Sequence, residues 1–341
     1  MNILWHSYAF FPDRGGIESS SLLMVRECLR SGHEVRVVTT SPEQTEAPPC
    51  PVDVPIFRNP DSASARGLGR WADVIVQNHL SFHLLRPVYS LPRPVFIHFQ
   101  TWLHRPERLI PRLAYRLRET LLLRCRLSAN SRALAQSLLL PARVLGNPYD
   151  DRLFFPQPTP PERELLYVGR LVSDKGVDLL LEALAVLAGN NRFPRLTIVG
   201  SGPEEANLRE QIRALGLREQ VHLAGPAHGR DLADYYRSHP LLVVPSRWEE
   251  PFGIVALEGA ACGCRIIGSD GGGLPDAIGP CGITFASGNP GDLAGKIERM
   301  LDHPDALTGS PDQCRQHLQQ HRPAHFLKRL LQHHPSTGKT P

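Results

Sequence analysis

The chain has 341 residues, which is long for one domain and suits two. Hydrophobic residues make up 41% and charged residues 21%, an ordinary globular composition, and no apolar run approaches the ~18 residues that span a bilayer. No basic stretch is interleaved with aromatic residues, so we expect no nucleic-acid partner. The start of the chain lacks a basic stretch followed by a long apolar core, so we expect a cytoplasmic protein without a signal peptide.

Short apolar runs alternate with amphipathic helical stretches in the first half, which indicates a parallel sheet with crossover helices. A loop that contains Gly15 and Gly16 separates the first predicted strand from the first predicted helix. In chain order we predict the strand Asn2–Trp5, the helix Glu18–Arg30 and the strands Glu34–Thr39, Asp73–Val76 and Val95–His98, with Pro141–Leu145 closing the pattern.

The second half restarts the same alternation. We predict strands at Leu165–Gly169, Leu196–Val199, Val221–Leu223, Leu241–Val244 and Arg265–Gly268, and helices at Val177–Leu187 and Pro203–Leu215. Between the halves, five prolines fall within the fourteen residues 148–161, which prevents a regular helix or strand and marks a hinge. The sequence therefore predicts an α/β protein with two Rossmann-like domains, 1–147 and 163–318, joined by a Pro-rich hinge, 148–162. A C-terminal helix and tail, 319–341, is expected to pack back on the first domain.

The seven cysteines are scattered, odd in number and contain no CxxC pair. This pattern predicts reduced thiols instead of a disulfide framework or a zinc site. The spacing of His317, His321 and His325 resembles a metal-binding helix face, but Pro323 interrupts the helix. We predict no metal site and no cofactor.

The segment from Pro245 to Glu258 (PSRWEEPFGIVALE) carries the sharpest chemical signal. A strand ends at Pro245 and a helix begins near Gly253. The free backbone amides at Phe252, Gly253 and Ile254 suit phosphate or sugar oxygens. Glu250 and Glu258 can accept hydrogen bonds from sugar hydroxyls beside them. An ordinary acidic helix start would give similar residues.

This segment resembles the retaining glycosyltransferases of family four, the glycosyl transferases group 1, which have the GT-B fold. Their two glutamates are separated by seven residues, as Glu250 and Glu258 are, and the segment Gly271–Asp276 (GGGLPD) looks like their Gly-Gly-Leu-Pro-acid segment. The resemblance implies that Glu250 contacts the donor sugar and Glu258 the nucleotide ribose. It also implies two Rossmann-like domains that face each other across a cleft, with the acceptor on the N-terminal side and the nucleotide diphosphate sugar on the C-terminal side.

A second signal places Arg170 and Lys175 after the strand that ends at Gly169. Open parallel sheets bind ligands at such carboxyl ends. Two cations there can bind a diphosphate and stabilise the charge that grows on it as it leaves, work that a metal ion would otherwise do. The family uses a matching Arg and Lys in this way. Surface charges that flank a helix start are the alternative interpretation.

Three further positions rest mainly on the resemblance. It implies that Gly16 lies against the donor phosphate and that His98 contacts the donor sugar at the edge of the cleft. It also places Ala227 where relatives offer backbone groups to the base. A plain turn at Gly16 and a satisfied, half-buried histidine at His98 stay open.

The stretch 103–127 contains seven arginines and two glutamates, with leucines at helical spacing. It predicts a basic amphipathic helix, which leaves open peripheral contact with the inner face of a membrane or a solvated arginine face over a leucine stripe.

The sequence therefore predicts a metal-independent, retaining, hexosyltransferase-type enzyme. It would move a sugar from a UDP- or GDP-linked donor to a carbohydrate or lipid-linked acceptor hydroxyl, in glycan, lipopolysaccharide or glycolipid synthesis. A GT-B-fold epimerase, which would lack this pair of glutamates, and a non-catalytic nucleotide-sugar-binding subunit are the alternatives.

Overall fold

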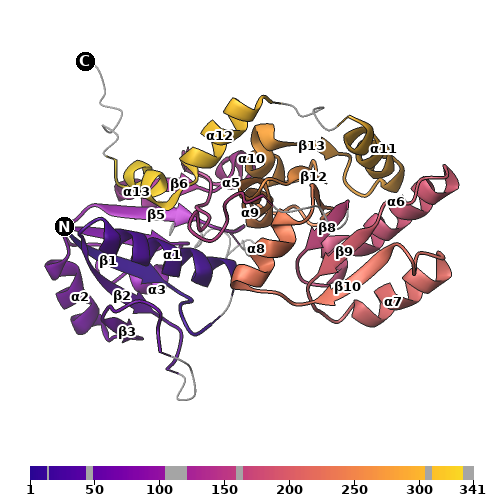
Figure 1. Ribbon diagram of the computed structural model, residues 1–341. Coiled ribbons are helices and arrows are strands. Elements are labelled where there is room, and N and C mark those ends of the chain that lie inside the picture. Colours follow the sequence, from indigo (N-terminus) through magenta and orange to yellow (C-terminus); the bar gives the residue numbers. More distant parts are fainter. Residues whose placement is uncertain (14, 44–48, 104–120, 159–163, 304–308, 333–341) are drawn as a thin grey trace. The chain divides into compact units, whose positions relative to one another are not determined.

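The computed structural model describes residues 1–13, 15–43, 49–103, 121–158, 164–303 and 309–332, and the structural statements below concern these residues. They form two compact units. The first unit comprises Met1–Pro148 and the segment that starts at Arg322, and the second unit comprises Tyr149–His321. Each unit contains one sheet flanked by helices (Figure 1).

The sheet of the first unit has seven parallel strands in the order β3-β2-β1-β4-β5-β6-β7. The strands are β1 (Asn2–Ser7), β2 (Glu34–Thr39), β3 (Ile56–Arg58), β4 (Val74–Asn78), β5 (Val95–Phe99), β6 (Arg126–Ala129) and β7 (Arg143–Val144). The helices are α1 (Gly16–Arg30), α2 (Ser62–Trp71), α3 (Phe82–Leu85), α5 (Arg132–Ser137) and α13 (Pro323–Leu331), with a 3₁₀ turn η1 at Leu121–Arg124. Strand order reverses between β1 and β4, which makes their carboxyl ends the switch point where such sheets bind ligands.

The sheet of the second unit has six parallel strands in the order β10-β9-β8-β11-β12-β13. The strands are β8 (Leu165–Val168), β9 (Leu196–Val199), β10 (Val221–Gly225), β11 (Leu241–Val244), β12 (Arg265–Ser269) and β13 (Gly282–Phe285). The helices are α6 (Val177–Gly189), α7 (Glu205–Ala214), α8 (Gly229–Arg237), α9 (Ile254–Cys262), α10 (Leu274–Ile278), α11 (Pro290–Asp302) and α12 (Pro311–Gln320), with 3₁₀ turns η2 at Ser173–Lys175 and η3 at Gly279–Cys281. Its switch point lies between β8 and β11.

Both sheets are buried on their two faces, as parallel sheets are when helices cover them. In β1, Ile3 and Trp5 belong to one apolar cluster and Leu4 to the cluster on the opposite face, because successive side chains of a strand alternate. Helix α13 contacts α1 on the first of these faces (Figure 1). The predicted α/β class is confirmed.

Several elements differ from the sequence prediction. Helix α1 begins at Gly16, so Gly16 lies in the helix and not in the preceding loop. The strands β3, β6 and β13 were not predicted. Most of the predicted basic helix at 103–127 lies outside the described residues, but its end is wrong: Arg126 and Leu127 belong to β6, because their backbone pairs with Phe96 and Ile97 of β5.

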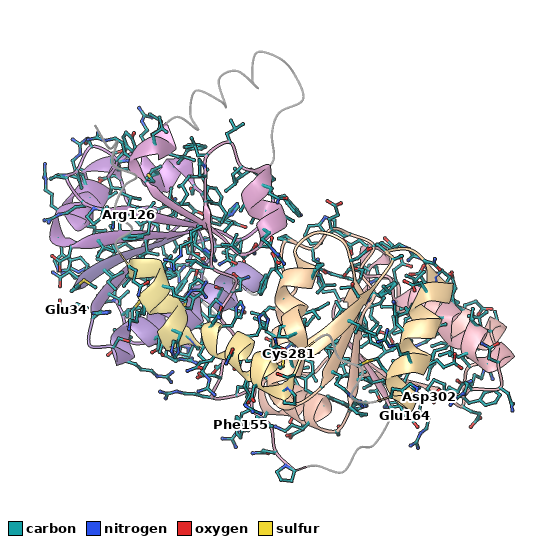
Figure 2. The ribbon with its side chains drawn as sticks, turned by 90° about the horizontal axis from the view of Figure 1, so that it is seen from above. Glu34, Arg126, Phe155, Glu164, Cys281 and Asp302 are labelled. Atoms are coloured by element: carbon teal, nitrogen blue, oxygen red, sulfur yellow. A yellow bond between two sulfur atoms is a disulfide. The ribbon has the colours of Figure 1, made fainter. Side chains whose placement is uncertain are left out.

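The prediction that all cysteines are reduced thiols is also wrong. Cys281 and Cys314 form a disulfide, with their Cα atoms 5.0 Å apart (Cys281 is labelled in Figure 2). Helix α12 packs against η3, which brings together two cysteines 33 positions apart in sequence. Helix α12 has no fully buried residue, and the disulfide anchors it together with the partly buried Leu318 and the hydrogen bond from His317 to the carbonyl of Ala277.

Candidate functional site

The carboxyl ends of β8 and β11 bring together the residues of the two strongest sequence motifs. The loop after β8 carries Arg170 and Lys175, and the loop after β11 carries Glu250. The backbone N–H groups of Arg247 and Trp248 both donate to the carbonyl of Asp174, at 2.9 and 3.1 Å. These bonds tie one loop to the other across the switch point.

Gly176 allows this close approach. Its φ is +68°, and a Cβ placed on it would lie 2.0 Å from the carbonyl oxygen of Pro245. A side chain there would push the two loops apart, since such a distance is far below van der Waals contact. The glycine that follows Lys175 is therefore part of what holds Lys175 beside the second loop.

Lys175 and Glu250 form an ion pair at the centre of the site. Nζ of Lys175 lies 2.5 Å from Oε1 of Glu250, and the two side chains are 17% and 12% exposed. The hydroxyl of Ser246 donates to the same oxygen at 2.7 Å. Within the part of the chain that the structure describes, nothing donates to Oε2 of Glu250. The carboxylate is thus fixed through one oxygen and offers the other to a ligand.

Arg170 lies at the same edge of the sheet, next to the buried side chain of Tyr167. The Tyr167 hydroxyl donates to the backbone carbonyl of Arg170 at 2.9 Å, which anchors the start of the loop. Burial raises the pKa of Tyr167, and the charges of Glu250 and Asp174 raise it further, whereas Arg170 opposes them. The Arg170 side chain is exposed, so its guanidinium is accessible at this edge.

Helix α9 begins next to Glu250. Gly253 caps it with φ +97°, and the backbone N–H groups of Phe252, Gly253 and Ile254 donate to no acceptor among the described residues. The Phe252 ring is 2% exposed and packs on His321 of the α12 end, 5.6 Å between ring centroids. Three free amides at a helix start form a site for an anion or for sugar oxygens.

The glycine-rich segment Gly271–Asp276 packs against the loop that carries Glu250. The N–H of Gly273 donates to the carbonyl of Glu250 at 2.7 Å. Gly272 has φ +61°, and a Cβ on it would lie 2.4 Å from that same carbonyl oxygen. Leu274 packs against Gly253, where a Cβ would meet it at 2.5 Å. These residues position the backbone of Glu250 and contribute no side chain to the site.

Glu258 lies in α9, facing α8. Its carboxylate accepts a hydrogen bond from the Tyr236 hydroxyl at 3.1 Å. Burial raises the pKa of Glu258 to about 7; the bond from Tyr236 opposes this, and the charge of Asp150 adds to it. Ala227, the predicted base contact, follows β10 and packs partly buried against the same apolar cluster as Tyr236.

The first unit contains the other two predicted residues. Gly16 is exposed at the start of α1, and no atom lies within 4 Å of a Cβ placed on it. The Glu18 carboxylate folds back over the same helix start, because a Cβ on Gly15 would meet its Oε2 at 2.5 Å. The Glu18 carboxylate offsets the positive potential at the start of α1 and would repel a phosphate at Gly16.

His98 is the second-last residue of β5 and is 2% exposed. Its Nδ1 pairs with the Ser128 hydroxyl at 2.9 Å and its Nε2 with Oδ1 of Asn147 at 3.3 Å. Burial lowers its pKa to about 4. A contact with a sugar would require one of these bonds to open, so the catalytic role of His98 stays a prediction.

The sequence analysis did not identify three residues that position Glu250, Glu258 and Lys175. Ser246 fixes Glu250, Tyr236 bonds to Glu258, and Gly176 permits the loop contact. The one signal in the sequence for Gly176 was its position directly after Lys175, a candidate phosphate-binding residue. Nothing in the sequence marks Tyr236 among the tyrosines.

The described residues contain no candidate membrane span and no candidate metal cluster. No helix described there is long and apolar enough to cross a bilayer. No three His, Cys, Asp or Glu side chains within those ranges come together as metal ligands.

The family model described as glycosyl transferases group 1 matches residues 150–320, nearly the whole second unit. A similar curated protein is the D-inositol 3-phosphate glycosyltransferase 2 of Catenulispora acidiphila, 35% identical over 164 residues, 45% of this chain and 38% of that protein. Another is the D-inositol 3-phosphate glycosyltransferase of Frankia alni, 38% identical over 151 residues, 41% and 37% of the two chains. The chain thus spans well under half the length of the curated relatives it matches.

Solved structures resemble the whole chain. A glycosyltransferase from Rickettsia africae has a TM-score of 0.78 at 17% identity, covering 97% of this chain and 96% of that one. Anabaena HepE in complex with UDP has a TM-score of 0.77 at 20% identity, covering 97% and 98%. At such identities the likeness shows the fold, which is the GT-B fold.

Proposed function

Because this chain belongs to the glycosyl transferases group 1 and has the GT-B fold, we propose that it transfers a sugar from a nucleotide diphosphate to an acceptor hydroxyl with retention of configuration. The observation that carries the proposal is the ion pair of Lys175 and Glu250 at the switch point of the second unit, next to the free amides of α9. Within one cluster of loops, Arg170 and Lys175 can bind the diphosphate of a sugar nucleotide. The Glu250 carboxylate and the free amides of α9 can bind sugar hydroxyls and phosphate or sugar oxygens.

The leaving group is the diphosphate, and it gains negative charge as the glycosidic bond breaks. The Lys175 ammonium has three N–H donors. One of them bonds to Glu250, which leaves two for phosphate oxygens. Arg170 adds a second, exposed cation on the same edge. Preorganised cations at the site of growing charge stabilise a transition state without reorganisation. We therefore propose that the transfer needs no metal ion and no other cofactor.

The two glutamates divide the donor between them. Glu250 accepts a sugar hydroxyl through its free Oε2, beside the ring that acquires oxocarbenium character. Glu258 accepts from the ribose hydroxyls in its ionised form. The N–H groups of Phe252, Gly253 and Ile254 bind phosphate or sugar oxygens. Gly16, His98 and Ala227 keep their predicted roles as proposals, with Glu18 opposing a phosphate at Gly16.

The donor is a UDP- or GDP-sugar, and the acceptor is a carbohydrate or a lipid-linked molecule. The names of the curated relatives support an acceptor hydroxyl, and the UDP complex of HepE supports a uridine donor. Peripheral contact with a membrane through 103–127, and a cytoplasmic location, also remain predictions.

A panel of UDP- and GDP-sugars tests the proposal, with the full chain and with water or added sugars as acceptor. Mass spectrometry should find nucleotide release from at least one donor, and it should persist in EDTA. Proton NMR should show that the anomer formed first has the donor's configuration. Conversion of the donor sugar to its epimer would make the chain an epimerase, and tight binding of every donor without turnover would make it a binding subunit. Inversion, or loss in EDTA with recovery in Mg²⁺, would refute the mechanism.

A further inference from the structure

A second group of polar side chains lies at the switch point of the first unit, where β1 and β4 end. Asn78 donates to the Ser21 hydroxyl at 2.6 Å, and Ser21 donates to the Ser7 hydroxyl at 2.9 Å. Gln100 donates to Oδ1 of Asn78 at 2.8 Å. All four side chains are buried. A connected, buried network of this kind holds its neighbours rigidly.

His79 stands directly on this network with a strained backbone. Its φ is +66°, a conformation that residues other than glycine adopt rarely. Its N–H donates to the carbonyl of His98 at 2.7 Å, and its Nδ1 accepts the N–H of Gln100 at 3.3 Å. Strained residues that the surroundings fix firmly are concentrated at functional sites.

The hydrogen bond to Nδ1 sets the tautomer of His79. Since Nδ1 accepts, the ring proton of the neutral form is on Nε2, and burial lowers the pKa to about 4, which keeps the ring neutral. Among the described residues, nothing accepts from Nε2, yet Nε2 is not one of the fully buried unpartnered atoms. His79 is 8% exposed, so its Nε2–H donor is only partly accessible at this edge, and because Nε2 carries the proton it does not act there as a base.

Tyr8 provides an aromatic surface next to that donor. Its ring is 5.8 Å from the His79 ring in an edge arrangement, and the residue is 38% exposed. The Glu18 carboxylate is close enough to raise the pKa of Tyr8, after the larger effect of burial. The cation Arg58 is occupied, since its two terminal nitrogens donate to the carbonyls of Ser41 and Phe11. The Glu18 carboxylate is thus a negative charge beside the Tyr8 ring.

We propose that Tyr8 and His79 bind an uncharged sugar ring, the acceptor of the reaction. An aromatic face with a neutral N–H beside it matches the C–H face and a hydroxyl oxygen of a pyranose, whereas a phosphate would meet the Glu18 carboxylate. His79 is a positioning residue that holds a hydroxyl next to the nucleophile. The proposal rests on the transfer activity proposed above, and it separates this chain from relatives named for an acceptor with a phosphate.

The variant His79→Asn isolates the donor. Asparagine tolerates the left-handed backbone and can still accept from the Gln100 N–H, but it does not reach the position of Nε2. Tyr8→Ala removes the ring at an exposed position, and His83→Asn, an exposed histidine in α3, is the matched control. The probes are methyl α-D-glucopyranoside, methyl α-D-mannopyranoside and their 6-phosphates.

Saturation-transfer NMR on the full chain should show binding of the uncharged glycosides and weaker binding of the phosphates. His79→Asn should weaken glycoside binding about three- to tenfold, and the double variant with Tyr8→Ala about thirtyfold or more. His83→Asn should bind as wild type does, and nucleotide diphosphate affinity should stay within a factor of about two throughout.

Equal glycoside binding by wild type and the double variant would overturn the proposal, as would tighter binding of the 6-phosphates. The same experiment is independent of turnover. If the wild type turns over no donor with water or with any added sugar as acceptor, the proposed transfer fails, but the binding data still decide whether this edge takes an uncharged sugar.

Discussion

Glu258→Gln probes a carboxylate whose environment in α9 disfavours its charge. Burial raises the folded-state pKa to about 7, above the ordinary value of 4.5. A raised pKa stabilises the fold fully below the unfolded value, and this contribution is lost as pH rises through about 7. The interval corresponds to roughly 3 kcal/mol at most. Because glutamine stays neutral and can accept from Tyr236, the variant should be about 1 kcal/mol more stable than wild type at pH 5 and about 3 kcal/mol more stable at pH 8.

Urea denaturation at pH 5, 6.5 and 8 measures this difference. The unfolding free energy of Glu258→Gln minus that of wild type should grow from about 1 kcal/mol at pH 5 to about 3 kcal/mol at pH 8, since the charge is penalised only where it exists. A difference that does not depend on pH, or a variant less stable than wild type at pH 8, would refute the reasoning about this buried carboxylate.

The same titration predicts how nucleotides bind. If the ionised carboxylate accepts the ribose hydroxyls, wild-type affinity for UDP or GDP should rise with pH through about 7 beyond any change that the nucleotide's own phosphate causes. Glu258→Gln serves as the control that retains only the phosphate effect. Calorimetric titrations between pH 5.5 and 8.5 should therefore diverge for the two proteins, and parallel curves would remove Glu258 from the nucleotide site.

Three shorter predictions address the loops and the disulfide. Cys314→Ser should lower the unfolding free energy by about 4 kcal/mol or less, because the disulfide joins residues 33 positions apart, and dithiothreitol should do the same to wild type. If neither change lowered the melting temperature, the disulfide would not anchor α12. Gly176→Ala should destabilise more than Gly216→Ala, because both have left-handed φ but only the first meets a backbone carbonyl; equal thermal shifts would show that the loop contact is not tight. Glu18→Gln should tighten nucleotide diphosphate binding about three- to tenfold if a phosphate contacts the start of α1, and an unchanged Kd would place that phosphate elsewhere.

Sequence reasoning succeeded where local pattern decides structure. The strands Leu196–Val199 and Leu241–Val244 were predicted with their observed bounds, because each is a short apolar run with clear ends. It failed at β3, three residues long, and at β6, where arginine and leucine spacing looked helical. Pairing with β5 decided the second case, and pairing is not visible in one strand's sequence.

The candidate site shows the same division. The motifs identified Lys175 and Glu250 individually, but their direct contact depends on 75 residues of intervening fold. The disulfide between Cys281 and Cys314 was missed because connectivity cannot be derived from spacing. The burial of His98 and the left-handed backbone of His79 depend on how the strand ends are packed, which propensity does not predict.

The central claim is that Glu250 acts on the sugar and Lys175 on the diphosphate, and Glu250→Gln with single-turnover transfer and nucleotide titration tests it most directly. Losing the carboxylate charge should slow transfer about ten- to a hundredfold, the worth of a charged hydrogen bond in the transition state. It should also release Lys175 from its partner, so the bare nucleotide diphosphate should bind as well as before or more tightly. Unchanged transfer, or loss of nucleotide binding in Glu250→Gln, would contradict this assignment.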